Sequence, residues 1–391
     1  MEDFHNLLIL MVVVWGMGKL FRIISLPVIF GELLGGIIVG PALLGLVDPS
    51  SHMIQVLAEL GVFFLMLHAG LETDAKELYK GSKKSVLIAV LALICSFGGG
   101  FFVADLFGFT IYQSLFIATA ISTTSIDISV RILKDYKLQN TNFGHTILSA
   151  AIITDLLILI IFSIILKLIE TGSLDFAEVA FMLLKIIAFF AVVIIGGLKT
   201  QKYIGKFFKT KGFTLTLIIA LFLGYLAEWI GLHVVIGAFL AGLFIREEVL
   251  DAKVFAKIED RIYGLSYSFL GPIFFTSLAF NLEFTGLQNN PELFLTLFVV
   301  GFFGKFIGGY ISSVYQKIKK QKAVLIGLAM NSKSSVDLII ISIGLKQGII
   351  DKETFSVLIA LVFSLTLTTI LLVKPIVKRL KFKSRKESYY H

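Results

Sequence analysis

Long apolar stretches separated by short polar segments run through the chain from end to end. Most are about 20 residues long, which is enough to cross the hydrocarbon core of a bilayer as a helix. The charged residues gather in the segments between them. The pattern predicts an all-α polytopic membrane protein with about thirteen transmembrane helices, at residues 5–24, 27–46, 53–71, 84–105, 110–131, 143–167, 177–198, 212–229, 231–246, 265–282, 293–314, 322–345 and 354–376.

The composition supports a membrane protein and argues against a soluble one. Of the 391 residues, 57% are hydrophobic and 16% are charged, whereas soluble domains have about 45–50% apolar and about 25% charged residues. A water-soluble fold has no means of covering this much apolar surface, so we expect a single transmembrane unit over 1–391. The one cysteine, Cys95, lies in an apolar stretch, so no disulfide within the chain is expected.

The basic residues lie almost entirely on one side of the predicted membrane. Of the 35 Lys and Arg residues, 29 lie in alternate connecting segments and in the tail, and only Lys167, Lys346 and Lys352 lie in the other segments. This asymmetry predicts an outside N-terminus and a short basic cytoplasmic tail at 377–391. The net charge of +8 then faces anionic lipid, not nucleic acid. We expect a multi-pass protein of a prokaryotic cytoplasmic membrane.

Two similar sequence pairs indicate an internal repeat. The run Gly31–Val39 resembles Gly237–Ile245 at an offset of 206 residues, and Thr124–Ile128 resembles Ser334–Leu338 at an offset of 210. They predict two five-helix repeats at 27–167 and 231–376, joined by the spans within 177–229. Because the first helices of the repeats run in opposite directions, the repeats are inverted. Inverted repeats are typical of secondary transporters, which bind substrate near the midplane between discontinuous helices.

Polar runs in the middle of two apolar stretches predict where these helices break. They are Ser122–Ser125 and Asn331–Ser335, at corresponding places in the two repeats. Their hydroxyl and amide groups can satisfy the backbone groups that unwinding exposes. We expect two crossed discontinuous helices here, and the alternative is intact helices whose Ser and Thr side chains bond back to their own turns.

Asp155 lies halfway along an apolar stretch and is the principal candidate site residue. An ionised carboxylate at the centre of a transmembrane helix costs about 2.5–3.5 kcal/mol on insertion scales. Such a group is tolerated if it binds either a proton or a hard monovalent cation. One oxygen site shared by the two ions is the least that an exchange mechanism requires. The alternative is a structural partner for a buried lysine.

Four further charged residues lie within or beside the predicted spans of the repeats. Lys305 is in the middle of a stretch and too deep to reach the interface, so we expect it to pair with Asp155, Asp127 or Asp337. A purely structural ion pair and a proton-carrying role are both open for it. Asp127 and Asp337 follow the two polar breaks and Lys333 lies inside one. They bind the ion or neutralise half-helix ends.

These residues and several longer runs resemble the monovalent cation:proton antiporter superfamily, in the NapA-like and Kef-type branch. The resemblance covers nearly the whole chain as a membrane domain. It is strongest at Leu26–Pro41 and Ala58–Asp74, and it includes Gly237–Gly242 and Pro272–Phe275. It implies a core domain with crossed broken helices, a dimerisation domain and therefore a homodimer.

By position, the resemblance assigns the family's essential aspartate to Asp155, its lysine to Lys305 and its crossover to Thr123–Asp127. The implied ion and proton site is Asp155 with Thr154, Thr124, Ser125 and Asp127, and the implied charge-compensating residues are Lys305, Lys333 and Asp337. Thr154 stands where relatives have Asp, Asn or Gln, and Lys333–Ser335 where many have Arg-Gly-Glu or Gly-Gly-Glu. Ion choice and stoichiometry therefore do not transfer from the family.

The function we expect is secondary antiport of a monovalent cation, Na⁺ by preference, for H⁺ by alternating access around Asp155. The alternatives are a K⁺/H⁺ antiporter, a Kef-like K⁺ efflux channel and, with less support, a sodium-coupled organic anion symporter. The sequence contains no nucleotide-binding loop, metal-ligand cluster or catalytic triad. We therefore expect neither enzyme activity nor a cofactor beyond the transported ions, and nothing in the sequence indicates a separate regulatory subunit.

Overall fold

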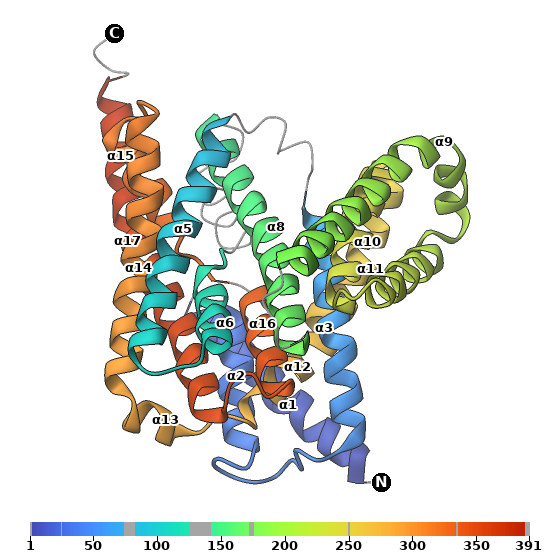
Figure 1. Cartoon of the computed structure of the whole chain (residues 1–391). Coiled ribbons are helices and arrows are strands. Elements are labelled where there is room, and N and C mark those ends of the chain that lie inside the picture. Colours follow the sequence, from blue (N-terminus) through green and yellow to red (C-terminus); the bar gives the residue numbers. More distant parts are fainter. Residues whose placement is uncertain are drawn as a thin grey trace. The chain divides into compact units, whose positions relative to one another are not determined.

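The computed structural model describes residues 2–24, 26–73, 83–124, 142–171, 176–248, 251–333 and 335–387, and the regular elements in these ranges are all helices (Figure 1). Within this part of the chain, eight helices are long and apolar enough to cross a membrane, and three shorter apolar helices accompany them. The prediction of an all-α polytopic membrane protein is confirmed.

Contacts group the helices into two compact units. Unit 1 comprises Met1–Ala75 and Glu170–Glu283, and unit 2 comprises Lys76–Ile169 and Phe284–His391. The boundaries differ from those of the predicted repeats at 27–167 and 231–376, because each predicted repeat gives its first two spans to unit 1 and its last three to unit 2. The repeats themselves stay a prediction.

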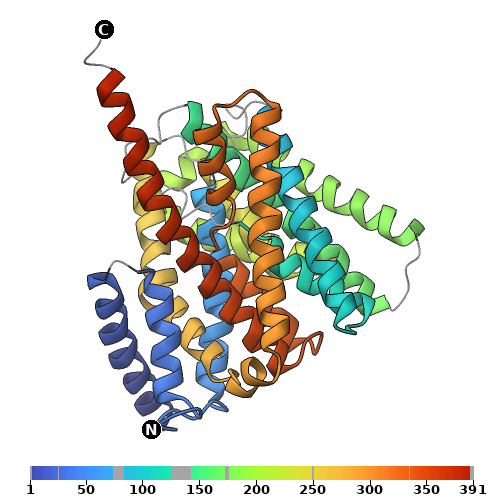
Figure 2. The same cartoon turned by 90° about the vertical axis from the view of Figure 1, so that its left-hand side faces the viewer.

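Unit 1 combines helices from its two sequence segments. Figure 2 shows α1 and α2 side by side, in blue. Leu10 and Val14 of α1 pack in one apolar cluster with Val39, Ile54 and Ile273. The elements are α1 (Glu2–Ile23), α2 (Val28–Val39), α3 (His52–Glu72), α9 (Phe176–Trp229), α10 (Val234–Glu248), α11 (Ala252–Leu265), the π-helix η1 (Ser266–Leu270) and α12 (Gly271–Ala279).

Three helix boundaries in unit 1 differ from the prediction. α2 ends at Val39 instead of continuing to residue 46, because Pro41 disfavours a helical conformation at Gly40, whose backbone is extended. The predicted spans 177–198 and 212–229 belong to one continuous helix, α9, whose ribbon turns back on itself (Figure 1). The span predicted at 265–282 is the end of a longer helical stretch that starts at Ala252.

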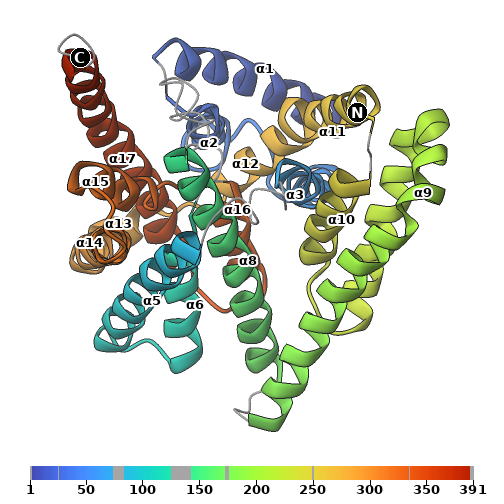
Figure 3. The same cartoon turned by 90° about the horizontal axis from the view of Figure 1, so that it is seen from above.

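Unit 2 contains the helices that hold the candidate site residues. They are α5 (Lys83–Leu106), α6 (Ile111–Ser122), α8 (Asn142–Thr171, whose last residues belong to unit 1), α13 (Phe284–Asn289), α14 (Pro291–Tyr315), α15 (Lys320–Ala329), α16 (Ser335–Lys346) and α17 (Lys352–Glu387). Seen from above, α14 and α15 run side by side (Figure 3). α14 also packs closely against α5, because a side chain at Gly308 would meet the backbone of Leu91 and Ala92.

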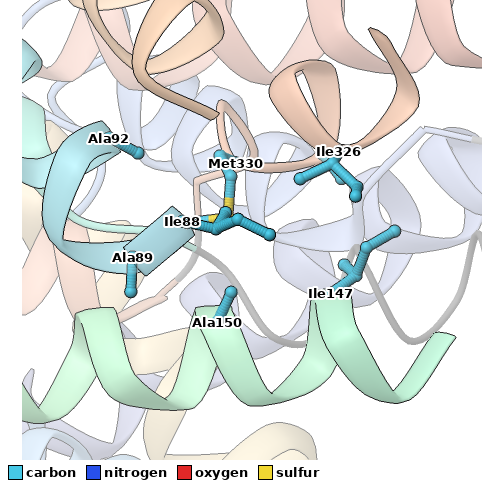
Figure 4. Packing of buried hydrophobic residues seen from close by; sticks show 8 residues of the cluster. Ile88, Ala89, Ala92, Ile147, Ala150, Ile326 and Met330 are labelled. Carbon is cyan, nitrogen blue, oxygen red and sulfur yellow. The ribbon is translucent and has the colours of Figure 1, made fainter. Parts of the chain in front are cut away.

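An apolar cluster fixes the end of α15 against two other helices of unit 2 (Figure 4). Met330, the residue after α15, packs with Ile88 and Ala92 of α5 and with Ile147 and Ala150 of α8. These side chains are all at most 3% exposed. The cluster therefore holds the end of α15 beside the turn of α8 that precedes Asp155.

Candidate functional site

Two helices of unit 2 stop where the sequence predicts breaks. α15 ends at Ala329 and α16 begins at Ser335, so the predicted discontinuity of the span 322–345 is confirmed. α6 ends at Ser122, and Thr123 has an extended backbone with φ −66° and ψ 159°. The segment that follows, with the predicted site residues Ser125 and Asp127, lies outside the described residues.

Lys333 joins the two breaks. Its Nζ donates hydrogen bonds to Ile121 O at 2.7 Å and to Thr123 O and Oγ1 at 3.1 Å each. Ile121 O and Thr123 O lie at the C-terminal end of α6, where the helix dipole favours a positive charge. Nζ also lies 3.3 Å from Asp337 Oδ1, in the first turn of α16, where the dipole favours a negative charge. This geometry supports half-helix neutralisation as the role of Lys333 and Asp337.

Lys305 makes a different contact from the one we expected. Its Nζ donates a hydrogen bond to Thr124 Oγ1 at 2.7 Å, and that hydroxyl donates in turn to Met330 O at 3.2 Å. The expectation was a direct pair with a carboxylate, and the ion pair that we observe for Asp337 is with Lys333. Thr124 thus links α14 to both breaks, which makes it a positioning residue for Lys305.

Asp155 lies in the middle of α8, where it is 7% exposed. The neighbouring Thr154 hydroxyl donates to Ala150 O at 2.9 Å, so it bonds back to its own helix. Asp155 lies within electrostatic range of both Lys305 and Lys333. Asp155 is therefore close enough to both buried lysines for their charges to interact.

The described part of the site is a buried cluster of two ammonium groups and two carboxylates. Lys305, Lys333 and Asp337 are each at most 3% exposed. Burying charges in a low-dielectric interior is tolerated when they balance and when hydrogen bonds complete the pairing. Asp155 is the most exposed of the four and so the best placed to exchange an ion with solvent.

Some contacts of the site were not anticipated from the sequence. The main-chain oxygens of Ile121 and Met330 act as acceptors, and an apolar residue type gives no sign of such a role. Asn331 was anticipated as part of a polar break but not as a site residue, although its side chain is 0% exposed. An amide in the middle of an apolar stretch is the sequence signal that could have singled it out.

Helices that are broken between buried, balanced charges are typical of membrane transporters of ions. The family model described as sodium/hydrogen exchanger, transmembrane, matches residues 7–379, and the chain belongs to this family.

Two relatives and one solved structure show similarity to antiporters over nearly the whole chain. The chain is 29% identical to a Na⁺/H⁺ antiporter of Enterococcus hirae over 96% of this chain and 99% of the relative. It is 30% identical to the Na⁺/H⁺-K⁺ antiporter GerN of Bacillus cereus, over 88% of each chain. The fold is similar to that of the sodium proton antiporter MjNhaP1 of Methanocaldococcus jannaschii, with a TM-score of 0.78 at 18% identity over 97% of this chain and 99% of that one.

Proposed function

We propose that this chain is a secondary active antiporter that exchanges Na⁺ for H⁺ across the membrane, with Asp155 as the shared binding group. The observation that supports this most directly is a carboxylate in the middle of a transmembrane helix, in the same unit as a broken helix and the end of α6, in a member of the sodium/hydrogen exchanger family. A carboxylate binds a proton or a hard cation in the same place, so the two ions compete and each displaces the other.

The surrounding residues keep that competition confined to Asp155. Lys333 is tied to the end of α6 and to Asp337, and Lys305 to Thr124. Both ammonium groups are therefore held in place while Asp155 changes its ligand. Thr154 carries no ionisable proton and bonds back to Ala150 O, so it supplies no second carrier. No cofactor is required beyond the transported ions.

K⁺ is the second candidate for the exchanged cation. The printed name of the relative GerN includes K⁺ as well as Na⁺, and that relative is 30% identical to this chain. Carboxylate, hydroxyl and carbonyl oxygens bind both cations, so the described groups permit either. We place Na⁺ first because the family model and the Enterococcus hirae relative are named for Na⁺.

The proposed arrangement in the membrane follows from charge and resemblance. We infer that the chain lies in a prokaryotic cytoplasmic membrane with its N-terminus outside and its basic tail in the cytoplasm, because the basic residues are so unevenly distributed. We infer a homodimer from the family resemblance. Two inverted repeats at 27–167 and 231–376 are proposed from the sequence matches at offsets of 206 and 210 residues.

The test is exchange in proteoliposomes that contain a pH-sensitive dye. Adding Na⁺ outside acid-loaded vesicles should make the interior more alkaline, Li⁺ and K⁺ should be compared in the same assay, and choline should have no effect. Asp155→Asn keeps the size of the side chain but cannot ionise, so it should abolish exchange while the protein still inserts and elutes as a folded species. Asp105→Asn, on the exposed end of α5, is the matched control. Normal exchange by Asp155→Asn would refute the role of Asp155.

A further inference from the structure

Asn331 has an unusual environment inside the broken helix. Its side chain is 0% exposed, and its Nδ2 donates a hydrogen bond to Gly327 O at 3.1 Å. A carbonyl oxygen only accepts, so the amide nitrogen must be the atom that faces Gly327. Oδ1 therefore points the other way, and among the described residues it has no hydrogen-bond partner. A buried amide oxygen without a donor is destabilising, so it requires an explanation.

Three side-chain oxygens at the end of α6 already accept hydrogen bonds from donors. Thr124 Oγ1 accepts from Lys305, Thr123 Oγ1 accepts from Lys333, and Ser122 Oγ accepts from Ser96. Asn331 Oδ1 differs from these three because no donor from the described ranges reaches it. A neutral oxygen of this kind is available to a cation, whereas an oxygen that a lysine already occupies is not.

The chain neighbours of Asn331 lie in the region of Asp155. Met330 packs against Ala150, one helical turn before Thr154 and Asp155 (Figure 4). Lys333, two residues after Asn331, lies within electrostatic range of Asp155. Asn331 thus lies between two residues that both adjoin the region of Asp155.

We propose that Asn331 Oδ1 is a ligand of the transported alkali cation and completes the oxygen set that Asp155 begins. This inference rests on the proposed exchange function and assigns one further residue to it. Small cations such as Na⁺ need several oxygens to replace their water, and unwound helices are where transporters supply neutral ones. The hydrogen bond from Nδ2 to Gly327 holds Oδ1 in a fixed direction, so little ordering is needed when the ion arrives.

The inference is tested by cation binding, separately from transport. Purified protein in choline buffer is titrated with NaCl, LiCl or KCl at fixed pH, and the melting temperature reports binding because an ion that binds only the folded state stabilises it. Asn331→Leu removes the oxygen at similar volume and should weaken apparent Na⁺ affinity by about tenfold or more, which corresponds to loss of one good ligand. Asn331→Thr keeps one oxygen and a donor for Gly327 O, so its Na⁺ affinity should lie between that of the wild type and that of Asn331→Leu.

The matched control is Asn281→Leu. Asn281 also donates from Nδ2 to the carbonyl four residues earlier, Ser277 O at 3.5 Å, but it lies in unit 1 after α12. Its Na⁺ titration should match that of the wild type. If Asn331→Leu does not fold, Asn331→Thr still reports the loss of affinity.

The outcomes separate this inference from the proposed function. The inference would be overturned by an unchanged Na⁺ titration in folded Asn331→Leu, or in Asn331→Thr if the leucine variant does not fold. Oδ1 would then be assigned to a hydrogen bond from a bound water. The same applies if no alkali cation stabilises the wild type. If the wild type binds Na⁺ but moves no protons in vesicles, the proposed exchange fails while the ligand assignment stands or falls on the titration alone.

Discussion

Lys333 connects two chain segments that lie 210 residues apart in the sequence. It is a buried ammonium group with three acceptors at the end of α6 and a carboxylate partner, Asp337, that is 0% exposed. Removing one member of a buried ion pair leaves the other uncompensated, which is far more costly than removing both. The stability of the junction between α6 and α16 should therefore depend on the charge balance between these two residues.

We predict that Lys333→Met lowers the free energy of unfolding by about 3–5 kcal/mol, because buried Asp337 loses the ammonium group that balances its charge. The double variant Lys333→Met/Asp337→Leu should recover a large part of this loss. The measurement is unfolding by heat or by detergent for the two single variants, the double variant and the wild type. Lys320→Met, at the exposed start of α15, is the control and should have little effect. Equal losses in the single and double variants would show that the ion pair is not what stabilises the junction between α6 and α16.

At the level of helices, two glycines at corresponding places in the predicted repeats lie at close helix contacts. A side chain at Gly36 of α2 would meet Thr276 O and, at 2.7 Å, Ala279 Cβ in α12. A side chain at Gly242 of α10 would meet Leu67 O of α3. The two positions are 206 residues apart, the offset of the sequence match, and small residues allow such close approach of transmembrane helices.

We predict that Gly36→Ala and Gly242→Ala each destabilise the protein by about 1–3 kcal/mol, because the added methyl group overpacks a helix contact. Gly16→Ala in α1 is the control, since no atom lies within 4 Å of the place where its side chain would be. Melting temperatures in one detergent would give the comparison. Gly16→Ala should match the wild type, and a drop in only one of the other two variants would argue against equivalent roles in the two repeats.

Most of the fold was predictable from the sequence because lipid imposes one simple requirement. Each span must be apolar and about 20 residues long, so hydropathy locates it. The errors arose where other forces decide the helix end. Pro41 ends α2 early, and the charged residues before 265 are helical all the same, since Asp251 caps the N-terminus of α11 by accepting from Lys253 N and Val254 N.

The site was predictable in its residue types but not in its pairings. Asp155, Lys305, Lys333 and Asp337 are recognisable because ionisable residues in a membrane span are expensive. Which lysine meets which acceptor depends on how the end of α6 lies against the break between α15 and α16. Lys305 bonds to the Thr124 hydroxyl, and Lys333 bonds to main-chain oxygens of α6. Because every residue has a main-chain oxygen, no sequence signal distinguishes Ile121 as an acceptor.

At the scale of the whole molecule, the uneven distribution of basic residues predicts orientation. We predict that a cysteine placed at Lys206, in the middle of α9, is on the cytoplasmic side and unreactive to an impermeant thiol reagent added outside intact cells. The background is Cys95→Ser, because Cys95 is exposed. Permeabilised cells should restore labelling, which confirms that the thiol is accessible. Labelling from outside in intact cells would reverse the proposed topology.

The charges of the site predict the response of transport to voltage. In the described cluster, Lys305 is held by Thr124 and Lys333 by α6 and Asp337, and Thr154 supplies no second proton carrier. If Asp155 alone changes its ligand, one cation replaces one proton and no net charge crosses. Exchange in proteoliposomes should then proceed at the same rate with and without an imposed potential, and a solid-supported membrane should record no transport current. A current that scales with cation-driven exchange would mean that a second proton moves, and we would assign it to Lys305.

The contacts of the two lysines also bear on leakage. In the proposed mechanism, a bound proton or cation neutralises the Asp155 carboxylate, while Lys333 stays paired with Asp337 and Lys305 stays hydrogen-bonded to Thr124. When the site is empty, the ionised carboxylate would have to change sides through a low-dielectric interior while both lysines keep those bonds, at a penalty of several kcal/mol. An empty transporter would therefore reorient slowly, and the cell's proton gradient would not be dissipated when Na⁺ is scarce. The contacts that fix the lysines would then suppress uncoupled flow as well as permit exchange.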